Sequence, residues 1–343
     1  MKRRQVITGF IGFAAASVVP RLGQQLSEPS ESVVGVVDRG DPPMFDPPSD
    51  RERPVSLSAT IVDDMDDRDA QTMSGGSAPE AIQVPLTTAT ATDPQSNQAR
   101  HITAQAQKAI NKNVDFARDY ADDVFITDGE APLLHSVVLR LKNLQKTIGY
   151  GNFNLVSFDE ALSYSKRFAA IGAFTNEELE FIEKVFFASA TDYGFYGEKV
   201  TDKLTSQFNK SDTIKIPRSG HYLFKNESLA YYETLKRDVG ESIILTSGIR
   251  SNVKQLYLFL AKTVRVNGNL SRASRSLAPP GYSYHGIGDF DVGRTGWGAK
   301  NFTDDFASTN EFKRMQDLGY IAIRYDHGNN LGVRFEPWHI KVV

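Results

Sequence analysis

The sequence predicts an α+β fold with a small, largely antiparallel sheet and flanking helices, preceded by a helical subdomain and a disordered N-terminal tether. Three observations support this fold class. Apolar residues at helical spacing dominate residues 105–215, helices alternate irregularly with short strands over 216–343, and residues 26–104 show no hydrophobic periodicity. With 343 residues, of which 40% are hydrophobic and 24% charged, the chain can bury one sizeable core or two small ones.

Composition excludes several classes of function. The formal charge of -3 and the sequence pI near 6.1 create no general attraction to polyanions, so we expect no nucleic-acid partner. Cysteine is absent, which excludes disulfides, a cysteine nucleophile and thiolate zinc sites. Any metal must therefore be held by imidazole and carboxylate groups.

Residues 1–25 are typical of an export signal. Lys2, Arg3 and Arg4 precede the apolar run "QVITGFIGFAAASVV", which is too short and too rich in Gly and Ala for a membrane span. The arginine pair resembles a twin-arginine signal; an ordinary secretory signal or a short uncleaved anchor is the alternative. We therefore expect an exported protein of the periplasm or cell envelope, with no stable membrane span in its mature form.

Residues 26–104 are predicted to be a disordered linker. They are rich in Pro, Ser, Asp and Gly and bury too little apolar surface to offset their conformational entropy. The acidic run 63–69 fits a solvated linker better than an interaction patch.

Helical signals define the subdomain predicted at 105–215. The segment "PLLHSVVLRLKNLQKTI" places one apolar face at three- and four-residue steps, formed by Leu134, Val137, Leu141, Leu144 and Ile148. Two capping boxes follow, Ser157 with Glu160 and Thr175 with Glu178. We interpret His135, on the first of these helices, as a packed or surface histidine rather than a ligand.

The remaining residues, 216–343, carry a mixed pattern. "LAYYETLKRDV" and "SNVKQLYLFLAKTV" are typical of helices, and Ser308 with Glu311 predicts a cap for the helix "EFKRMQDLG". "SIILTSG", "YIAIRY" and "WHIKVV" are predicted strands because of their β-branched and aromatic content.

Candidate metal ligands lie in two segments of this last region. "PPGYSYHGIGDFDVG", residues 279–293, contains His285, Asp289 and Asp291, and "RFEPWHIKVV" places Glu336 three residues before His339. A zinc hydrolase needs ligands that leave one position for water and a carboxylate that takes the water's proton. Both aspartates share a face if their segment is a strand, so either could reach the metal.

Three motifs together resemble a known family. "SGIRS" at 247–251, "PPGYSYHGIGDFDVG" and "FEPWHIKV" occur in the order and spacing of the D-alanyl-D-alanine carboxypeptidase family of zinc metallopeptidases, which includes vancomycin-resistance-type D,D-dipeptidases and D,D-carboxypeptidases. The resemblance covers about residues 216–343. It implies a fold related to the Hedgehog signalling domain.

The resemblance also implies roles for individual residues. It implies Zn²⁺ as cofactor, with His285, Asp291 and His339 as ligands. Glu336 would be the catalytic base and Arg250 would bind the substrate carbonyl. The residues implied to contact substrate are Ser283, Gln255 and Trp338.

One departure from the family pattern leaves the aspartate open. The family string has seven steps from histidine to aspartate, whereas His285 and Asp291 are six apart. Val292 matches the hydrophobic residue after the family aspartate, which favours Asp291, and Asp289 is the alternative. His327 is a further candidate for which a surface or substrate-facing role is favoured, and His221 is favoured as structural.

The implied function is hydrolysis of wall peptides. The substrate would be a peptidoglycan stem peptide or precursor, from which the terminal D-alanine is removed. An L,D-carboxypeptidase or wall endopeptidase with the same site, and a non-catalytic zinc-containing binding module, are the alternatives. Glu336 and Arg250 favour an enzyme, because a binding module needs neither. We expect the helical segment to cover or shape the cleft; the sequence leaves the oligomeric state open.

Overall fold

The computed structural model describes residue 107, residues 111–225 and residues 227–343. The predicted export signal (1–25) and all of the predicted linker (26–104) lie outside these described residues. Among the helices that are described, none combines the length and the apolar content needed to cross a membrane.

Helices form the first part of the described chain. They are α3 (Ala131–Ile148), α4 (Tyr150–Phe153), α5 (Phe158–Arg167) and α6 (Asn176–Phe187). The predicted apolar face of α3 is buried over its first four members, from Leu134 to Leu144, and half-buried at Ile148. Both predicted capping boxes form, with Ser157 capping α5 and Thr175 capping α6. The helical character predicted for this segment is therefore confirmed.

The second part combines short strands with helices. Its strands are β1 (Thr213–Lys215), β2 (Tyr222–Phe224), β3 (Ile243–Ser247), β4 (Phe290–Arg294) and β5 (His339–Ile340). Its α-helices are α7 (Glu227–Val239), α8 (Asn252–Arg265), α9 (Leu270–Ser274) and α10 (Asn310–Leu318). The 3₁₀ segments of the described chain are η1 (Ala190–Tyr193), η2 (Lys210–Asp212), η3 (Tyr284–Gly286), η4 (Gly298–Phe302) and η5 (Asp304–Ser308).

Strand pairing is antiparallel throughout the two described sheets. β1 pairs with β2, and the larger sheet has the order β3-β4-β5. In that sheet Asp291 is the register partner of both Ser247 on β3 and His339 on β5. The predicted fold class, a small antiparallel sheet with flanking helices, is confirmed.

Three local predictions need correction. The cap of α10 is Thr309 rather than Ser308, because the Thr309 hydroxyl accepts the Phe312 backbone N–H at 3.1 Å. "YIAIRY" is not a strand and makes only an isolated bridge from Ile323 to Ile340. Of "WHIKVV", only His339–Ile340 is a strand, so β5 offers a very short edge to pair with.

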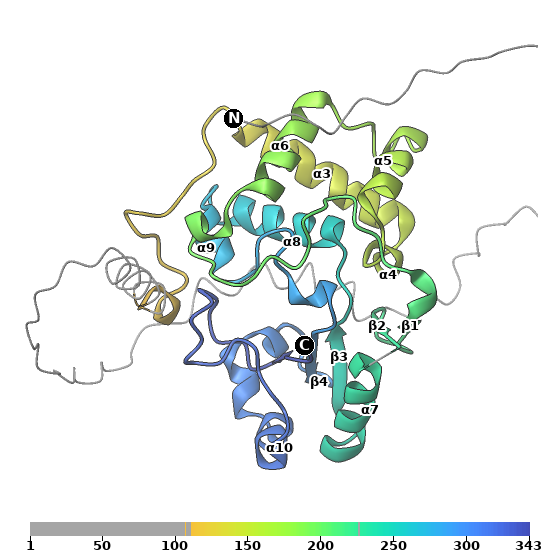
Figure 1. The fold of residues 1–343 in the computed structure, drawn as a ribbon, viewed down its shortest axis with the longest axis vertical. Helices are drawn as coiled ribbons and strands as arrows, with labels where there is room; N and C mark the ends of the chain where they lie inside the picture. Colours follow the sequence, from red (N-terminus) through yellow and green to blue (C-terminus); the bar gives the residue numbers. More distant parts are fainter. Residues whose placement is uncertain (1–106, 108–110, 226) are drawn as a thin grey trace, which may run out of the picture. The chain divides into compact units, whose positions relative to one another are not determined.

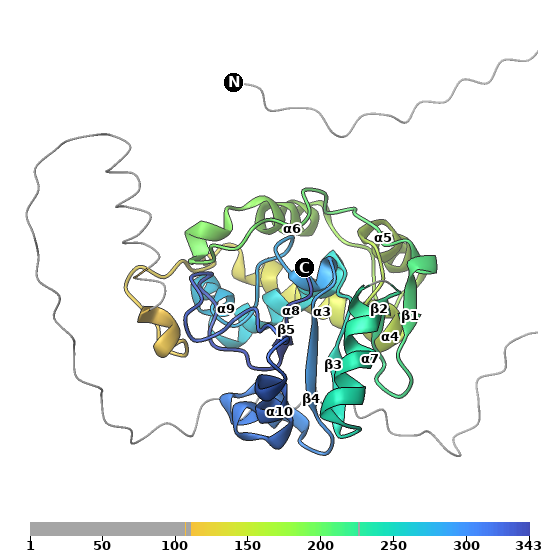
Figure 2. The same ribbon diagram turned by 60° about the horizontal axis from the view of Figure 1, so that its bottom comes forward.

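Two apolar cores lie side by side in the described chain. The first, here called the helical core, joins α3, α5 and α6 with α8 and α9. The second, the sheet core, joins β3, β4 and β5 with α7 and α10. Figures 1 and 2 show α3, α5, α6 and α8 in one half of the ribbon and β3, β4, α7 and α10 in the other. Helix α8 follows β3 directly, so it carries the chain from the sheet into the helical core. The domain boundary expected at 215/216 stays a prediction.

Candidate metal centre

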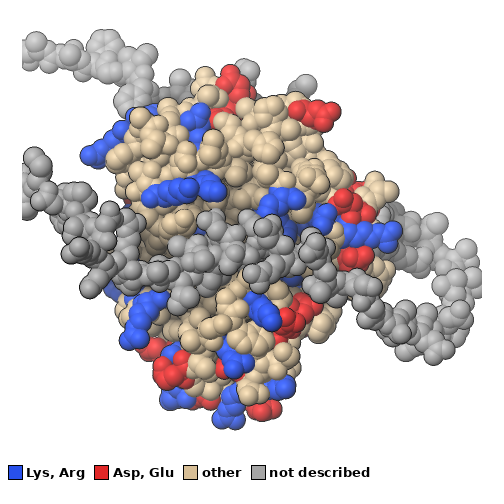
Figure 3. Space-filling view, turned by 180° about the vertical axis from the view of Figure 1, so that it is seen from behind, with Lys and Arg blue, Asp and Glu red and all other residues tan. Residues whose placement is uncertain are grey.

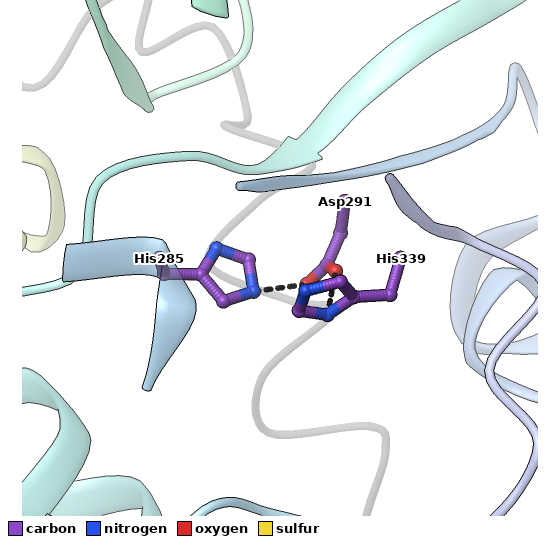
Figure 4. Close-up of side chains that lie close together, drawn as sticks. All are labelled: His285, Asp291 and His339. Carbon is purple, nitrogen blue, oxygen red and sulfur yellow. Dashed lines mark ion pairs between the residues drawn. The ribbon is translucent and has the colours of Figure 1, made fainter. Parts of the chain in front are cut away.

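His285, Asp291 and His339 converge on one point. Each offers a ligand atom, and these atoms all lie within 4.8 Å of one another. Nε2 of His285 lies 3.3 Å from Oδ2 of Asp291, and Nδ1 of His339 lies 3.2 Å from Oδ1 of the same carboxylate. Figure 4 shows both imidazole rings turned toward the aspartate from opposite sides. All three residues are buried.

The backbone explains why these side chains meet. The register of β4 and β5 places Asp291 directly beside His339. His285 arrives on η3, and the chain turns from η3 into β4 through Gly288, whose φ of 145° suits glycine and few other residues. Strand pairing therefore supplies two ligands and a glycine-dependent turn supplies the third.

The second nitrogen of each histidine has its own hydrogen-bond partner. Nδ1 of His285 lies 2.9 Å from the Gly248 carbonyl oxygen, which can only accept, so this nitrogen carries the proton. Nε2 of His339 lies 3.0 Å from Oδ2 of Asp289. These partners leave Nε2 of His285 and Nδ1 of His339 free to bind a metal, an orientation typical of histidine ligands.

Asp289 belongs to this supporting layer and not to the ligand cluster. Its carboxylate is fully buried and forms an ion pair with Arg324, whose Nη2 lies 3.1 Å from Oδ1. It also accepts the Val342 backbone N–H at 2.9 Å. Among the two aspartates that the sequence left open, the geometry thus places Asp291 beside both histidines and Asp289 behind His339.

The donor set fits a cation. Oδ1 of Asp291 is buried and has no hydrogen-bond partner in the described structure, although it faces an imidazole nitrogen. Burial, followed by the charge of Arg250, lowers the pKa of His285 to about 4, so its imidazole is neutral. Burial also disfavours the charged form of His339, but the hydrogen bond to Asp289 and the negative charge of Asp291 outweigh it and raise the pKa to about 9. A metal ion would replace that proton and satisfy all three acceptors, and two imidazoles with one carboxylate are a donor set that zinc accepts.

Glu336 lies at the edge of the cluster. Its side chain is buried, and Oε2 is 3.7 Å from Nδ1 of His339. Burial raises the pKa of Glu336 to about 7, against the opposing charges of His339 and Arg334. A carboxyl group with such a pKa can both take and return a proton near neutrality, as a general acid–base residue must.

Arg250 reaches the cluster from the loop between β3 and α8. Its Nη2 donates to Ser247 Oγ at 3.0 Å and to Asp291 Oδ2 at 3.2 Å, and its Nη1 donates to Gln255 Oε1 at 3.2 Å. Gln255 in turn donates from Nε2 to the Ala278 carbonyl at 2.5 Å and is only 1% exposed. Both ends of its amide are occupied, so Gln255 holds Arg250 in place, whereas the sequence predicted a contact with substrate.

A cavity of about 1090 Å³ opens onto the cluster. Of the residues predicted to act at the site, it is lined by Arg250, Ser283, His285, Asp291, Glu336, Trp338 and His339. Gln255 and Asp289 do not line it. Helix α3 contributes Val138 and Lys142, so the helical core forms part of the wall. This agrees with the expectation that the helical segment shapes the cleft.

The cavity wall carries several buried polar atoms that lack a partner among the described residues. Six of the nine buried side-chain atoms without a hydrogen-bond partner in the described chain belong to cavity-lining residues, namely His221, Thr246, Arg250, Ser276, Asp291 and Arg334. Buried polar atoms are costly unless water or a ligand satisfies them. On the face shown in Figure 3, by contrast, basic and acidic side chains are interspersed.

The remaining histidines considered as candidates differ in whether they line the cavity or are exposed. His221 lines the cavity, while His327 is exposed and stacks on Phe335 with ring centroids 3.7 Å apart. His135 is exposed, as the sequence allowed. Sequence reasoning missed Tyr325, which lines the cavity and packs its ring edge-on against His339 at 4.8 Å. No local pattern marks Tyr325, because its role depends on the path of the chain between α10 and β5.

Comparison with known proteins finds similarity over the last part of the chain. Residues 226–343 match the model of the VanY family, described as D-alanyl-D-alanine carboxypeptidase. A solved structure of a mutant vancomycin-resistance D,D-pentapeptidase VanY, from a VanB-type resistance cassette and in complex with Zn(II), is similar at 20% sequence identity and a TM-score of 0.30. That match covers 38% of this chain and 78% of the other. No curated protein matches the chain.

The matched residues include η3, β4 and β5, and with them all three members of the metal cluster and Glu336. The family resemblance of the three sequence motifs is thereby confirmed. Residues 226–343 are thus similar to the D-alanyl-D-alanine carboxypeptidase family, and the match covers about a third of the chain.

Proposed function

We propose that the protein is an exported, zinc-dependent peptidoglycan peptidase that removes the terminal D-alanine from wall peptides. The observation that carries the proposal is the position of Glu336, a buried carboxyl group beside a His-Asp-His cluster on the wall of a large cavity. The family match over 226–343 supports the proposed substrate class, a peptide ending in D-alanyl-D-alanine.

In this proposal His285, Asp291 and His339 hold one zinc ion. When bound, zinc acts as a Lewis acid that polarises a carbonyl group and lowers the pKa of water. Asp289 and the Gly248 carbonyl keep the two imidazole rings oriented through their outer nitrogens.

Glu336 moves the protons of the reaction. It takes a proton from the attacking water and returns it to the leaving amine of the terminal residue, because its pKa near 7 lets both forms be populated. Its distance of 3.7 Å from Nδ1 of His339 supports a role beside the proposed metal ligands and not as one of the three.

Arg250 stabilises the negative charge that develops on the carbonyl oxygen. Ser247, Gln255 and Asp291 fix its guanidinium before substrate arrives, so little reorganisation is needed during the reaction. Nε of Arg250 has no protein partner among the described residues and remains available for a ligand or water. Ser283 and Trp338 line the same cavity and complete the proposed substrate contacts.

Export is part of the proposal because the substrate lies outside the cytoplasm. It is supported by the basic head and apolar run of residues 1–25. Replacing Arg3 and Arg4 by lysine should retain the protein inside the cell if the signal is of the twin-arginine type. Unchanged export would instead indicate an ordinary secretory signal.

The decisive experiment measures bound zinc and D-alanine release from a pentapeptide wall precursor. We expect one zinc per chain, D-alanine release by the wild type, and a zinc-loaded but inactive Glu336→Ala variant. Release of a different product would assign an L,D-carboxypeptidase or an endopeptidase. Bound zinc with no cleavage of any wall peptide would indicate a binding module, and a protein without zinc affinity would contradict the proposal.

A further inference from the structure

Lys254 is a buried cation in the cavity for which the proposed mechanism has no use. It is only 6% exposed and lies in the first turn of α8, which Ser251 caps, one helical turn beyond Arg250. Its side chain lines the cavity and its Nζ lies over the rings of Phe153 and Tyr257, at 5.5 and 6.0 Å from their centroids.

The ammonium group of Lys254 is under-partnered. It has three N–H donors, and the described structure supplies one acceptor, Oε1 of Gln145 on α3 at 3.2 Å. No carboxylate of the described chain forms an ion pair with it; its charged neighbour is Arg250, another cation. Burying an ammonium group without a counter-ion is costly, and the positive end of the α8 dipole adds to that cost.

His221 contributes a second under-partnered polar group to the same cavity. It lies in the turn before β2, lines the cavity, and its Nδ1 is buried with no hydrogen-bond partner among the described residues. Burial, and then the charge of Lys254 followed by that of Arg250, lowers the pKa of His221 to about 3, so its ring is neutral. A neutral imidazole can donate one hydrogen bond to an anion beside the lysine.

Other cations on the cavity wall are better accounted for. Arg250 pairs with Asp291 at 3.2 Å. Arg334 donates to the Phe302 carbonyl at 2.9 Å, and its guanidinium lies over Phe116 and Trp338. Lys142 lines the cavity from α3 but is only half-buried, so water can solvate its charge.

We propose that Lys254, assisted by His221, forms a carboxylate-binding subsite that anchors the peptide substrate in the cavity. The inference rests on the proposed function, since it assigns the anion to a wall peptide. Gln145 orients the ammonium from the helical core, so a residue outside the matched family segment positions the anchor. The carboxylate is either the free C-terminus of the peptide or an acidic side chain within it. The negative charge of a bound carboxylate would offset the effects of burial and of Arg250, which lower the pKa of Lys254 to about 7.

The test separates binding from catalysis by using the zinc-loaded full chain with Glu336→Gln. Calorimetry compares four pentapeptides that end in D-Ala-D-Ala: free acid or amide at the C-terminus, combined with glutamate or glutamine at the internal acidic position. Each is measured with and without Lys254→Met. Lys254→Arg keeps the charge, and Lys142→Met removes a lysine from the same cavity as a matched control.

We expect the parent protein to prefer the acid form at one of the two positions by about 10- to 100-fold, the range of a hydrogen bond to a charged group. Lys254→Met should abolish that preference, Lys254→Arg should retain most of it, and Lys142→Met should leave it unchanged. If Lys254→Met removes the preference at the C-terminal position, the subsite binds the terminal carboxylate. If it removes the preference at the internal position, the subsite binds the acidic side chain. Bound zinc and the melting temperature verify that each variant is folded.

Preferences that survive Lys254→Met at both positions, or that Lys142→Met reduces equally, would overturn the subsite. A different result would contradict the proposed function alone. In that case the zinc-loaded wild type would bind the peptides in a Lys254-dependent manner but release no product from them. Failure of all four peptides to bind would overturn both proposals together.

Discussion

The helical core and the sheet core differ in how their sequences specify them. In the helical core, α3, α5 and α6 rely on contacts three and four residues apart and on two complete capping boxes. In the sheet core, β3 and β4 span five residues each and β5 spans two, so pairing depends on segments far apart in the chain. The metal cluster lies on the sheet side, where Asp291 and His339 depend on such a distant pairing and His285 depends on the turn at Gly288.

The difference teaches that stability and chemistry are separated in this molecule. The regular helices contribute packing and a cavity wall, while the short strands place reactive groups within hydrogen-bonding distance of one another. Substitutions in the two regions should therefore change different measured quantities.

The sharpest contrast comes from Glu336→Gln on the sheet side. Loss of the proton-transfer group should lower kcat by about 10²- to 10⁴-fold, with bound zinc and melting temperature unchanged. Steady-state D-alanine release and metal analysis check this. Glu233→Gln, at an exposed residue that also lines the cavity, is the control and should keep full activity. Equal losses in both variants would contradict the assigned role.

Leu141→Ala should show the opposite behaviour on the helical side. Leu141 is buried in the helical core, so the cavity left behind should lower the free energy of unfolding by about 2–5 kcal/mol. The kcat of the folded fraction should stay within about twofold, since a shift of that size is under 1 kcal/mol. Denaturant unfolding is the measurement, and Leu139→Ala at an exposed position of α3 is the control. A large fall in kcat at full folding would break the separation of roles.

Lys254 lies where the two regions meet and gives a pH test. Burial and Arg250 lower its pKa from 10.5 to about 7 in the folded state. Below pH 7 Lys254 is charged in both the folded and the unfolded protein, so the cost of burying its charge is fully present. As the pH rises from 7 toward 10.5, Lys254 loses its proton in the folded protein but keeps it in the unfolded one. The stability of the wild type therefore increases over this range. Lys254→Met should thus stabilise the protein more at pH 6 than at pH 10, by on the order of a few kcal/mol. Equal effects of the substitution at both pH values, measured by denaturant unfolding, would contradict it.

Asp289→Asn tests the supporting layer of the metal cluster. The neutral amide should weaken the hydrogen bond that orients His339, and zinc affinity should fall by about 10- to 100-fold. Competition with a zinc-binding dye measures this, with Asp304→Asn at an exposed site as control. If affinity does not change, the orientation of His339 does not depend on Asp289.

Thr175→Ala should give the smallest effect. It removes the side-chain acceptor of the α6 capping box and should cost about 1 kcal/mol of stability, with no change in zinc affinity or kcat. Thermal unfolding checks this, and Thr147→Ala near the end of α3 is a control that leaves both capping boxes intact. A change in zinc affinity would connect α6 to the metal cluster in a way that the contacts do not indicate.

Sequence reasoning succeeded where the determinants are local. The face of α3 and the caps at Ser157 and Thr175 need only neighbouring residues, and all are observed. Even there, the pattern predicts a cap at Ser308, whereas Thr309 caps α10, because two adjacent hydroxyl residues offer similar caps and only the backbone path decides between them.

The site could be predicted only in part, because its finer geometry is non-local. The motifs named the members of the cluster, but the choice between Asp289 and Asp291 depends on the register of β4 against β5, which pairs Asp291 with His339. Gln255 was expected at the substrate, and its position behind Arg250 follows from the Ala278 carbonyl more than 20 residues away. Lys254 and Tyr325 belong to no sequence motif. Their positions on the cavity wall depend on how the two cores pack together.

The path of α8 has a consequence for how this chain could be shortened or recombined. The residues that match the family begin at 226, yet Leu256, Phe259 and Leu260 of that stretch are covered by helices encoded before it. A gene fragment starting at 226 would express a protein with an uncovered apolar helix directly after the arginine of the site. Such a fragment should aggregate, so a shortened protein needs the helical segment to keep α8 covered.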